Sequence, residues 1–171
     1  AALAVSCGAD LVLELPCAFT LRSAEFFAQG GVSLLAASGC VNALCYGVES
    51  ADCDFLALAR IACDAGVQAQ LQTLLRQGTS YASAWEQLFA AHSEKLDKPL
   101  SSPNDILALS YTQAILRHGY DIEPFYVQRQ DSGYNSTQIS STLASATAIR
   151  QALATGNASW QQAVPPAVQN A

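Results

Sequence analysis

The chain has 171 residues, 51% of them hydrophobic and 13% charged, which suits one folded domain and excludes a disordered protein. Its longest uncharged apolar stretches have about a dozen residues, short of the roughly 20 that cross a membrane, and no secretory segment opens it, so we expect a cytoplasmic protein. The net charge of −6 disfavours general nucleic-acid binding, because such binding needs Lys and Arg to neutralise phosphates.

The chain begins with what reads as the end of a helix, closed by Gly8. It contains no methionine, and we therefore infer that a segment before Ala1 is missing. Residues 10–15 follow as a short apolar run that Pro16 ends, and this pattern predicts a buried strand.

A helix and a second strand come next. Residues 22–38 carry apolar side chains at helical spacing, and Gly39 caps the predicted helix. Residues 41–46 predict a strand that has Gly47 at its carboxyl end. Strand, helix and strand within about 35 residues form a βαβ unit, and such units build parallel sheets. We assign residues 1–53 to this βαβ part of the core.

Residues 54–119 predict an all-helical insertion between strands, which Gly119 closes. Four helical patterns open at or near Asp54, Val67, Ser80 and Pro103.

The remaining core is predicted over 120–157. It contains a third strand at 124–129, a polar loop over 131–142, and a last helix that ends near Leu153. Residues 158–171 are expected to form an irregular tail. Together these elements predict an α/β fold, namely a Rossmann-like parallel sheet with an all-helical insertion.

Candidate ligand-binding residues gather near the carboxyl ends of the predicted strands, where open α/β sheets bind ligands. Gly47 permits close backbone approach to a base or ribose, and Arg129 can clamp a phosphate. The Asn104 amide can pair with the donor and acceptor edge of adenine. Each also has a plainer explanation, as a strand-ending turn, a surface arginine or a helix cap.

A second group of candidates begins the last helix. Ser145 and Thr147 stand at its N-terminus, where backbone N–H groups and the helix dipole favour phosphate. Arg150, about one turn on, can add a bidentate cation. A plain Ser/Thr cap with a solvated arginine is the alternative.

Other reactive side chains identify no catalytic or metal site. His92 and His118 pair with no nucleophile nearby in the sequence. Glu49 and Asp52 could hold a metal or a ribose, but residues of this kind are more often solvated loop charges. No CxxC pair occurs, so a zinc site is unsupported and we expect reduced, structural thiols. The six cysteines are Cys7, Cys17, Cys40, Cys45, Cys53 and Cys63.

Several segments, in this order and spacing, resemble the tRNA(Met) cytidine acetate ligases, members of the HIGH-motif nucleotidyltransferase superfamily. They are Gly8–Pro16, Ser23–Gly30, Leu44–Gly47, Pro103–Leu109, Val127–Arg129 with Gly133 and Tyr134, and Ser145–Arg150. The match runs across nearly the whole chain, and no single segment would suffice.

The resemblance implies a nucleotidyltransferase-type core and a two-step reaction. ATP and acetate would form acetyl-adenylate, and the acetyl group would pass to N4 of the wobble cytidine of elongator tRNA(Met). Mg²⁺ is a further candidate cofactor. By position, six residues match the family's ATP-binding glycine, asparagine and arginine and the superfamily's second phosphate motif. They are Gly47, Asn104, Arg129, Ser145, Thr147 and Arg150.

The sequence also departs from the family. The HIGH-type histidine motif and the C-terminal helical region have no counterpart in the chain, so we expect the chain as it stands to lack full activity. Val48 stands where relatives usually carry serine, and Asp105 replaces a second asparagine.

Two other interpretations stay open. One is a different small-molecule nucleotidyltransferase that moves AMP or CMP onto a phosphorylated acceptor. The other is a non-catalytic α/β binding domain. The helical insertion and the Pro103–Asn104 pair favour the ligase, whereas the absent histidine motif favours the binding domain only if the natural gene starts near Ala1.

Overall fold

The structure, a computed structural model, describes residues 1–92, 102–129, 139 and 144–169. The chain divides into two compact units, one of Ala1–Glu14 with Gln130–Ala171 and one of Leu15–Arg129. The polar loop expected over 131–142 lies outside the described residues except for residue 139. Among the described helices, none combines the length and the apolar character needed to cross a membrane.

The sheet in the Leu15–Arg129 unit has two parallel strands, β1 (Ala43–Val48) and β2 (Glu123–Gln128). Their register places Ala43 opposite Glu123 and Val48 opposite Gln128. The strands predicted at 41–46 and 124–129 are confirmed, with small shifts at their ends. Because the two strands run parallel and helices connect them, the predicted α/β fold class is confirmed.

Helices make up the rest of this unit, and those between β1 and β2 confirm the predicted helical insertion. They are α2 (Cys17–Thr20), α3 (Ala24–Ala37), α4 (Phe55–Cys63), α5 (Ala65–Arg76), α6 (Tyr81–His92) and α7 (Pro103–His118). Local chemistry sets several of their ends. The Asp54 and Asp64 carboxylates accept backbone N–H groups at the starts of α4 and α5, and Gly119 ends α7 at a φ of 63°.

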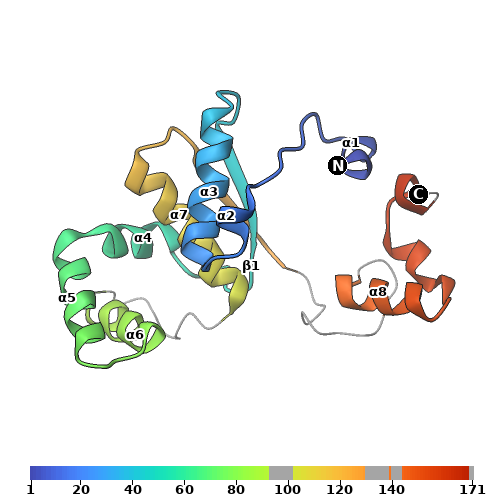
Figure 1. Cartoon of the computed structure of the whole chain (residues 1–171). Helices are drawn as coiled ribbons and strands as arrows, with labels where there is room; N and C mark the ends of the chain where they lie inside the picture. Colours follow the sequence, from blue (N-terminus) through green and yellow to red (C-terminus); the bar gives the residue numbers. More distant parts are fainter. Residues whose placement is uncertain (93–101, 130–138, 140–143, 170–171) are drawn as a thin grey trace. The chain divides into compact units, whose positions relative to one another are not determined.

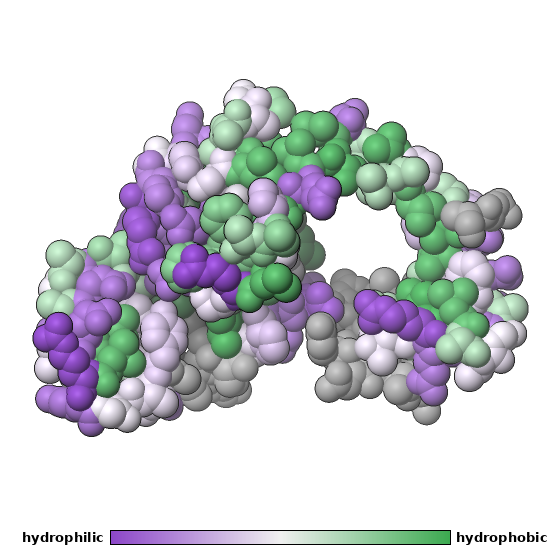
Figure 2. Space-filling model, viewed as in Figure 1, coloured by the Kyte–Doolittle hydropathy of each residue, from purple (hydrophilic) through white to green (hydrophobic). Residues whose placement is uncertain are grey.

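The core of this unit lies where α3 and α7 run side by side next to β1 (Figure 1). Val32 from α3 packs there against Ile115 from α7 and against Ile122, which precedes β2. A separate cluster joins α5 to α6 through Val67, Leu71, Ala84 and Leu88. Figure 2 shows the outer surface of this α5–α6 region as largely hydrophilic, with hydrophobic residues gathered in a strip. The two helices therefore bury one face each, as amphipathic helices do.

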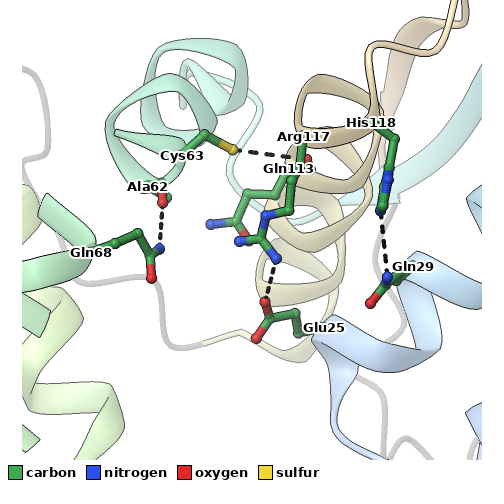
Figure 3. A network of polar contacts seen from close by, with 8 residues as sticks. All are labelled: Glu25, Gln29, Ala62, Cys63, Gln68, Gln113, Arg117 and His118. Carbon is green, nitrogen blue, oxygen red and sulfur yellow. Dashed lines mark hydrogen bonds and ion pairs between the residues drawn. The ribbon is translucent and has the colours of Figure 1, made fainter. Parts of the chain in front are cut away.

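Polar side chains also connect α3 to α7 (Figure 3). Arg117 on α7 donates a hydrogen bond of 2.8 Å to Glu25 on α3, and Gln29 lies 3.4 Å from His118. The Cys63 thiol, at the end of α4, donates to a carbonyl group of α7. The Arg117 and Glu25 side chains are 40% and 38% exposed, so solvent screens this pair and its contribution to stability is small.

Gly30 lies where α3 passes the ring of Phe19. A Cβ atom added to Gly30 would stand 2.3 Å from Phe19 Cγ and 2.7 Å from Phe19 Cβ. Since the Cβ of Phe19 is fixed to its backbone, α2 would have to move. We expect Gly30→Ala to lower the free energy of unfolding by about 1–3 kcal/mol, measured by urea denaturation.

The neighbouring glycine supplies the control. A Cβ added to Gly31 would meet no atom within 4 Å, and alanine favours the helix. We expect Gly31→Ala to raise the free energy of unfolding by up to about 1 kcal/mol. Equal effects of the two substitutions would contradict the packing of Phe19 against Gly30.

Residues 10–15 overturn one prediction, because they form no strand. Leu11, Val12 and Leu13 are 59%, 40% and 40% exposed. The segment leads from α1 toward α2 (dark blue in Figure 1) and is largely hydrophobic in Figure 2. A strand needs a neighbour for its backbone groups, and in the described residues β1 and β2 pair with each other and not with this segment. An apolar run by itself does not supply that neighbour.

The other unit contains α1 (Ala2–Ser6), α8 (Ala146–Ala154), a 3-10 helix η1 (Ala158–Ala163) and α9 (Pro166–Gln169). The helix end predicted before Gly8 and the predicted last helix are confirmed. The expectation of an irregular tail is wrong, since η1 and α9 occupy it. Two local contacts explain why this segment forms regular structure. Asn157 accepts the N–H of Ser159 at the start of η1, and Gln169 donates to the carbonyl of Gln161.

Candidate functional site

The carboxyl ends of β1 and β2 bring Gly47 and Arg129 together. Arg129 directly follows β2, and its backbone N–H donates to the carbonyl of Val48 at 2.8 Å. A Cβ added to Gly47 would stand 3.2 Å from Arg129 Cγ. The glycine therefore leaves room for the arginine side chain to lie over the strand, which places an exposed cation at this end of the sheet.

Asn104 reaches the same end of the sheet from the first turn of α7. Its Nδ2 donates a hydrogen bond of 2.8 Å to Oε1 of Glu49, which follows β1. Because Glu49 accepts from the amide nitrogen, the carboxamide has a defined orientation. The structure thus brings three of the predicted ATP-binding residues together in one unit: Gly47, Asn104 and Arg129.

Asp105 is the residue in this region whose role the sequence did not reveal. Its side chain is 2% exposed, and its carboxylate accepts hydrogen bonds from the N–H of Glu49, the N–H of Ser50 and the hydroxyl of Ser50. The local signal was Ser102-x-x-Asp105, a pattern typical of a capping box. The Ser102 half of that box is present, because its hydroxyl accepts the N–H of Asp105. The carboxylate instead binds the loop that follows β1.

A buried apolar base supports these polar groups. Val48, Phe55 and Ala108 are nearly inaccessible to solvent and pack together beneath the loop. The hydroxyls of Tyr46 and Thr112 share a hydrogen bond of 2.7 Å that joins β1 to α7. Burial raises the pKa of Tyr46, although its bond to Thr112 partly opposes that shift. The Tyr46–Thr112 bond therefore joins β1 to the middle of α7, away from the loop after β1, whereas Val48, Phe55 and Ala108 form the apolar base nearer the strand end.

Most of the cysteines, which we expected to be reduced, structural thiols, are exposed to solvent. All six lie in described residues and are free thiols, but Cys7, Cys17, Cys40 and Cys45 are exposed. Apolar neighbours in the sequence therefore do not predict burial of a cysteine, since Cys17 on α2 and Cys45 on β1 are both exposed.

Cys53 should react slowly with thiol reagents. Burial first, and then the carboxylates of Asp105, Asp52 and Asp54, raise the pKa of its thiol to about 11. At pH 8 only about 0.1% of such a thiol is the reactive thiolate. We expect iodoacetamide at pH 8 to label exposed Cys17 far faster than Cys53 in the native protein, as read by mass spectrometry.

The pH dependence of labelling at Cys53 tests whether the raised pKa is the reason for its slow reaction. The rate at Cys53 should rise about tenfold per pH unit until the pH approaches its pKa. Labelling of Cys53 at the rate of Cys17, or a rate that levels off below pH 9, would contradict the raised pKa.

The second predicted group lies on α8, in the unit of Ala1–Glu14 with Gln130–Ala171. Ser145 is the N-cap of this helix, and its hydroxyl accepts the N–H of Ala148 at 3.0 Å. Thr147 and Arg150 are exposed in the turns that follow. The capping role of Ser145 is therefore present, and the phosphate-binding role of Ser145, Thr147 and Arg150 stays a prediction.

The described residues do not form a dedicated metal site. Within residues 1–92, 102–129, 139 and 144–169, no three side chains of His, Cys, Asp or Glu gather so that they could hold an ion. Both carboxylate oxygens of Asp105 already accept hydrogen bonds.

Known proteins resemble this chain over its whole length. The family model described as HIGH Nucleotidyl Transferase matches residues 1–171. A tRNA(Met) cytidine acetate ligase of Syntrophotalea carbinolica is 39% identical, over 98% of this chain and 41% of the relative. Another, of Clostridium kluyveri, is 40% identical over 88% of this chain and 40% of the relative.

Two solved structures of Thermotoga maritima TmcAL share the fold at 30% sequence identity. The apo form has a TM-score of 0.81 and the form bound with alpha-thio ATP has one of 0.76. Each comparison covers 99% of this chain, and 42% and 41% of the TmcAL chains. The chain therefore spans about two fifths of the length of the relatives that it matches.

Proposed function

The chain belongs to the HIGH nucleotidyltransferase family, and we propose that the intact protein is an ATP-dependent ligase for tRNA. It would activate acetate as acetyl-adenylate and acetylate N4 of the wobble cytidine of elongator tRNA(Met). Relatives named tRNA(Met) cytidine acetate ligase, 39–40% identical, support the substrate class. The TmcAL structure bound with alpha-thio ATP supports ATP as the nucleotide substrate that we propose.

One observation within the chain supports the nucleotide site most strongly. Gly47, Asn104 and Arg129, three positions that match the family's ATP-binding residues, come from three separate segments and lie together at the carboxyl end of the parallel sheet. Open α/β sheets bind ligands at that end. We assign adenine recognition to the Asn104 amide and phosphate contact to Arg129.

The chemistry of acetate activation suits a site without a general base. An acetate oxygen attacks the α-phosphorus of ATP, the bond to the β-phosphate oxygen breaks, and pyrophosphate leaves. Acetate is already a nucleophile, so the site has to orient it and stabilise the charge that develops on the phosphoryl oxygens. We assign that stabilisation to Arg129. For Ser145, Thr147 and Arg150 on α8 we propose phosphate binding separately, because these positions match the superfamily's second phosphate motif.

The second step transfers the acetyl group. The N4 amine of cytidine attacks the acetyl carbon, AMP leaves with its electron pair, and a proton is lost from the amine. The chain carries 8 Lys and Arg against 14 Asp and Glu, so a local patch or another segment has to supply the positive charge that binds tRNA. We place the protein in the cytoplasm, where tRNA is modified, and we keep Mg²⁺ as a candidate partner of the ATP phosphates.

Exchange of labelled pyrophosphate into ATP tests the first step. The intact protein should catalyse exchange that depends on acetate, because acetyl-adenylate and pyrophosphate reform ATP. Transfer of labelled acetyl to elongator tRNA(Met), and its loss when the wobble cytidine is replaced by uridine, tests the second step.

Two other experimental outcomes would favour one of the two alternative functions. Exchange that ignores acetate but responds to a phosphorylated acceptor would indicate a nucleotidyltransferase that moves AMP or CMP. No binding of ATP by calorimetry would indicate a non-catalytic α/β binding domain.

A further inference from the structure

In the part of the chain that the structure describes, the buried carboxylate of Asp105 accepts its hydrogen bonds from the short loop that follows β1. Its carboxylate, on a side chain 2% exposed, lies 2.8 Å from the Glu49 nitrogen and 3.2 Å from the Ser50 nitrogen through Oδ1. The hydroxyl of Ser50 donates to Oδ2 at 2.8 Å. A buried carboxylate that lost these donors would pay a large desolvation cost. The loop after β1 and the first turn of α7 are therefore tied together.

Asp105 is connected to Asn104 through the loop residue Glu49, which contacts both. The backbone of Glu49 is bound by Asp105, and the side chain of Glu49 accepts a hydrogen bond of 2.8 Å from Asn104 Nδ2. Asn104 and Asp105 are neighbours on α7, so the loop and the helix contact each other through two adjacent residues. Without this backbone anchor the loop that carries the exposed Glu49 would have more conformations available, and Glu49 would orient Asn104 poorly.

We propose that Asp105 is a positioning residue for the nucleotide, because it anchors the Glu49–Ser50 loop so that Glu49 orients the Asn104 carboxamide. The inference rests on the proposed function, since it takes the Asn104 amide as the group that contacts ATP. Asp105 itself does not touch the nucleotide. Its effect is to make the amide ready before ATP arrives, which removes an ordering cost from binding.

The hydrogen bonds between Asp105 and the Glu49–Ser50 loop, here called the clamp, predict which substitution at position 105 preserves them. An asparagine at position 105 can still accept both backbone N–H groups at Oδ1, and its Nδ2 can donate to the Ser50 hydroxyl, which then accepts. Alanine can do neither. The clamp therefore depends on hydrogen bonds at position 105 and not on the negative charge.

The test compares Asp105→Ala, Asp105→Asn and Thr112→Val in the intact protein, with ATP affinity from calorimetry and stability from thermal unfolding. Thr112 is the matched control, because it is also buried and joins α7 to β1, about two helical turns from Asp105. We expect Asp105→Ala to weaken ATP binding by about tenfold or more, and Asp105→Asn to stay within about threefold of the parent. Thr112→Val should lower the unfolding temperature and leave ATP affinity unchanged.

A second pair of variants keeps the test valid if Asp105→Ala does not fold. Glu49→Ala should weaken ATP binding by about tenfold or more relative to the parent, whereas Glu49→Gln keeps an acceptor for Asn104 and should stay within about threefold. Unchanged ATP affinity in Glu49→Ala would overturn the proposal. Where Asp105→Ala does fold, the double alanine variant should lose little more than either single variant if Asp105 acts through Glu49.

Unchanged ATP affinity in Asp105→Ala, or a loss in Thr112→Val equal to that in Asp105→Ala, would overturn the proposal and leave the proposed function standing. Additive losses in the double variant would overturn it too. A parent protein that does not bind ATP would overturn the proposed function together with this inference.

Discussion

Arg150→Ala is expected to slow acetate-dependent exchange of pyrophosphate into ATP by about 100- to 1,000-fold, the range seen when one donor to a developing oxyanion is removed. Arg150 lies in the second turn of α8, close to the N-terminal end that Ser145 caps. Its guanidinium can donate two hydrogen bonds to phosphoryl oxygens, which gain charge as pyrophosphate leaves. The loss should therefore appear in kcat as well as in KM.

The control for Arg150 lies next to it. Gln151 is exposed on the same helix, and Gln151→Ala should leave exchange unchanged, since it removes no charge. Arg150→Lys should recover part of the rate, because lysine keeps the cation but not the two-pronged geometry. An Arg150→Ala protein with the rate of the parent would show that Arg150 is an ordinary surface arginine on a capped helix.

Asn104→Ala is expected to weaken ATP binding by about 10- to 100-fold, because a group that pairs with adenine is lost and the edge of the base is left unsatisfied. Asn104→Asp should weaken it at least as much. That substitution places a carboxylate where the amide now donates to Glu49 at 2.8 Å, and two carboxylates at that distance repel. Calorimetry with ATP measures both effects.

The matched control is a neighbour on the same helix that faces solvent. Ile106 is 41% exposed in the first turns of α7, and Ile106→Ala should change ATP affinity by less than about twofold. Ser102 is the N-cap of α7, so the structure does not support the helix cap considered for Asn104. Should Asn104→Ala bind ATP as the parent does, Asn104 would have a structural role alone, through its hydrogen bond to Glu49.

The longer helices and the two strands of the sheet could be predicted because their signals are local, whereas the four-residue helix α2 was not predicted. The apolar spacing within α4, α5 and α7 and the glycines that close α3 and α7 lie inside the elements that they define. Segments 10–15 and 158–171 were predicted wrongly for the opposite reason. A strand exists only with a partner, and the tail is ordered by contacts such as Gln169 with Gln161 that composition does not reveal.

The sequence by itself determined the fold class, the helical insertion and the identity of six candidate nucleotide-binding residues, since periodicity, caps and motif order are written along the chain. Only the tertiary structure shows which of these residues lie close together and which other residues they contact. Glu49 and Asn104 are 55 positions apart, and the Arg129 side chain lies over Gly47 because the register of β1 and β2 puts their ends together. The role of Asp105 needed the structure as well. Its local pattern predicts a capping box, and the lower free energy of a buried carboxylate with three donors turns it to the loop after β1 instead.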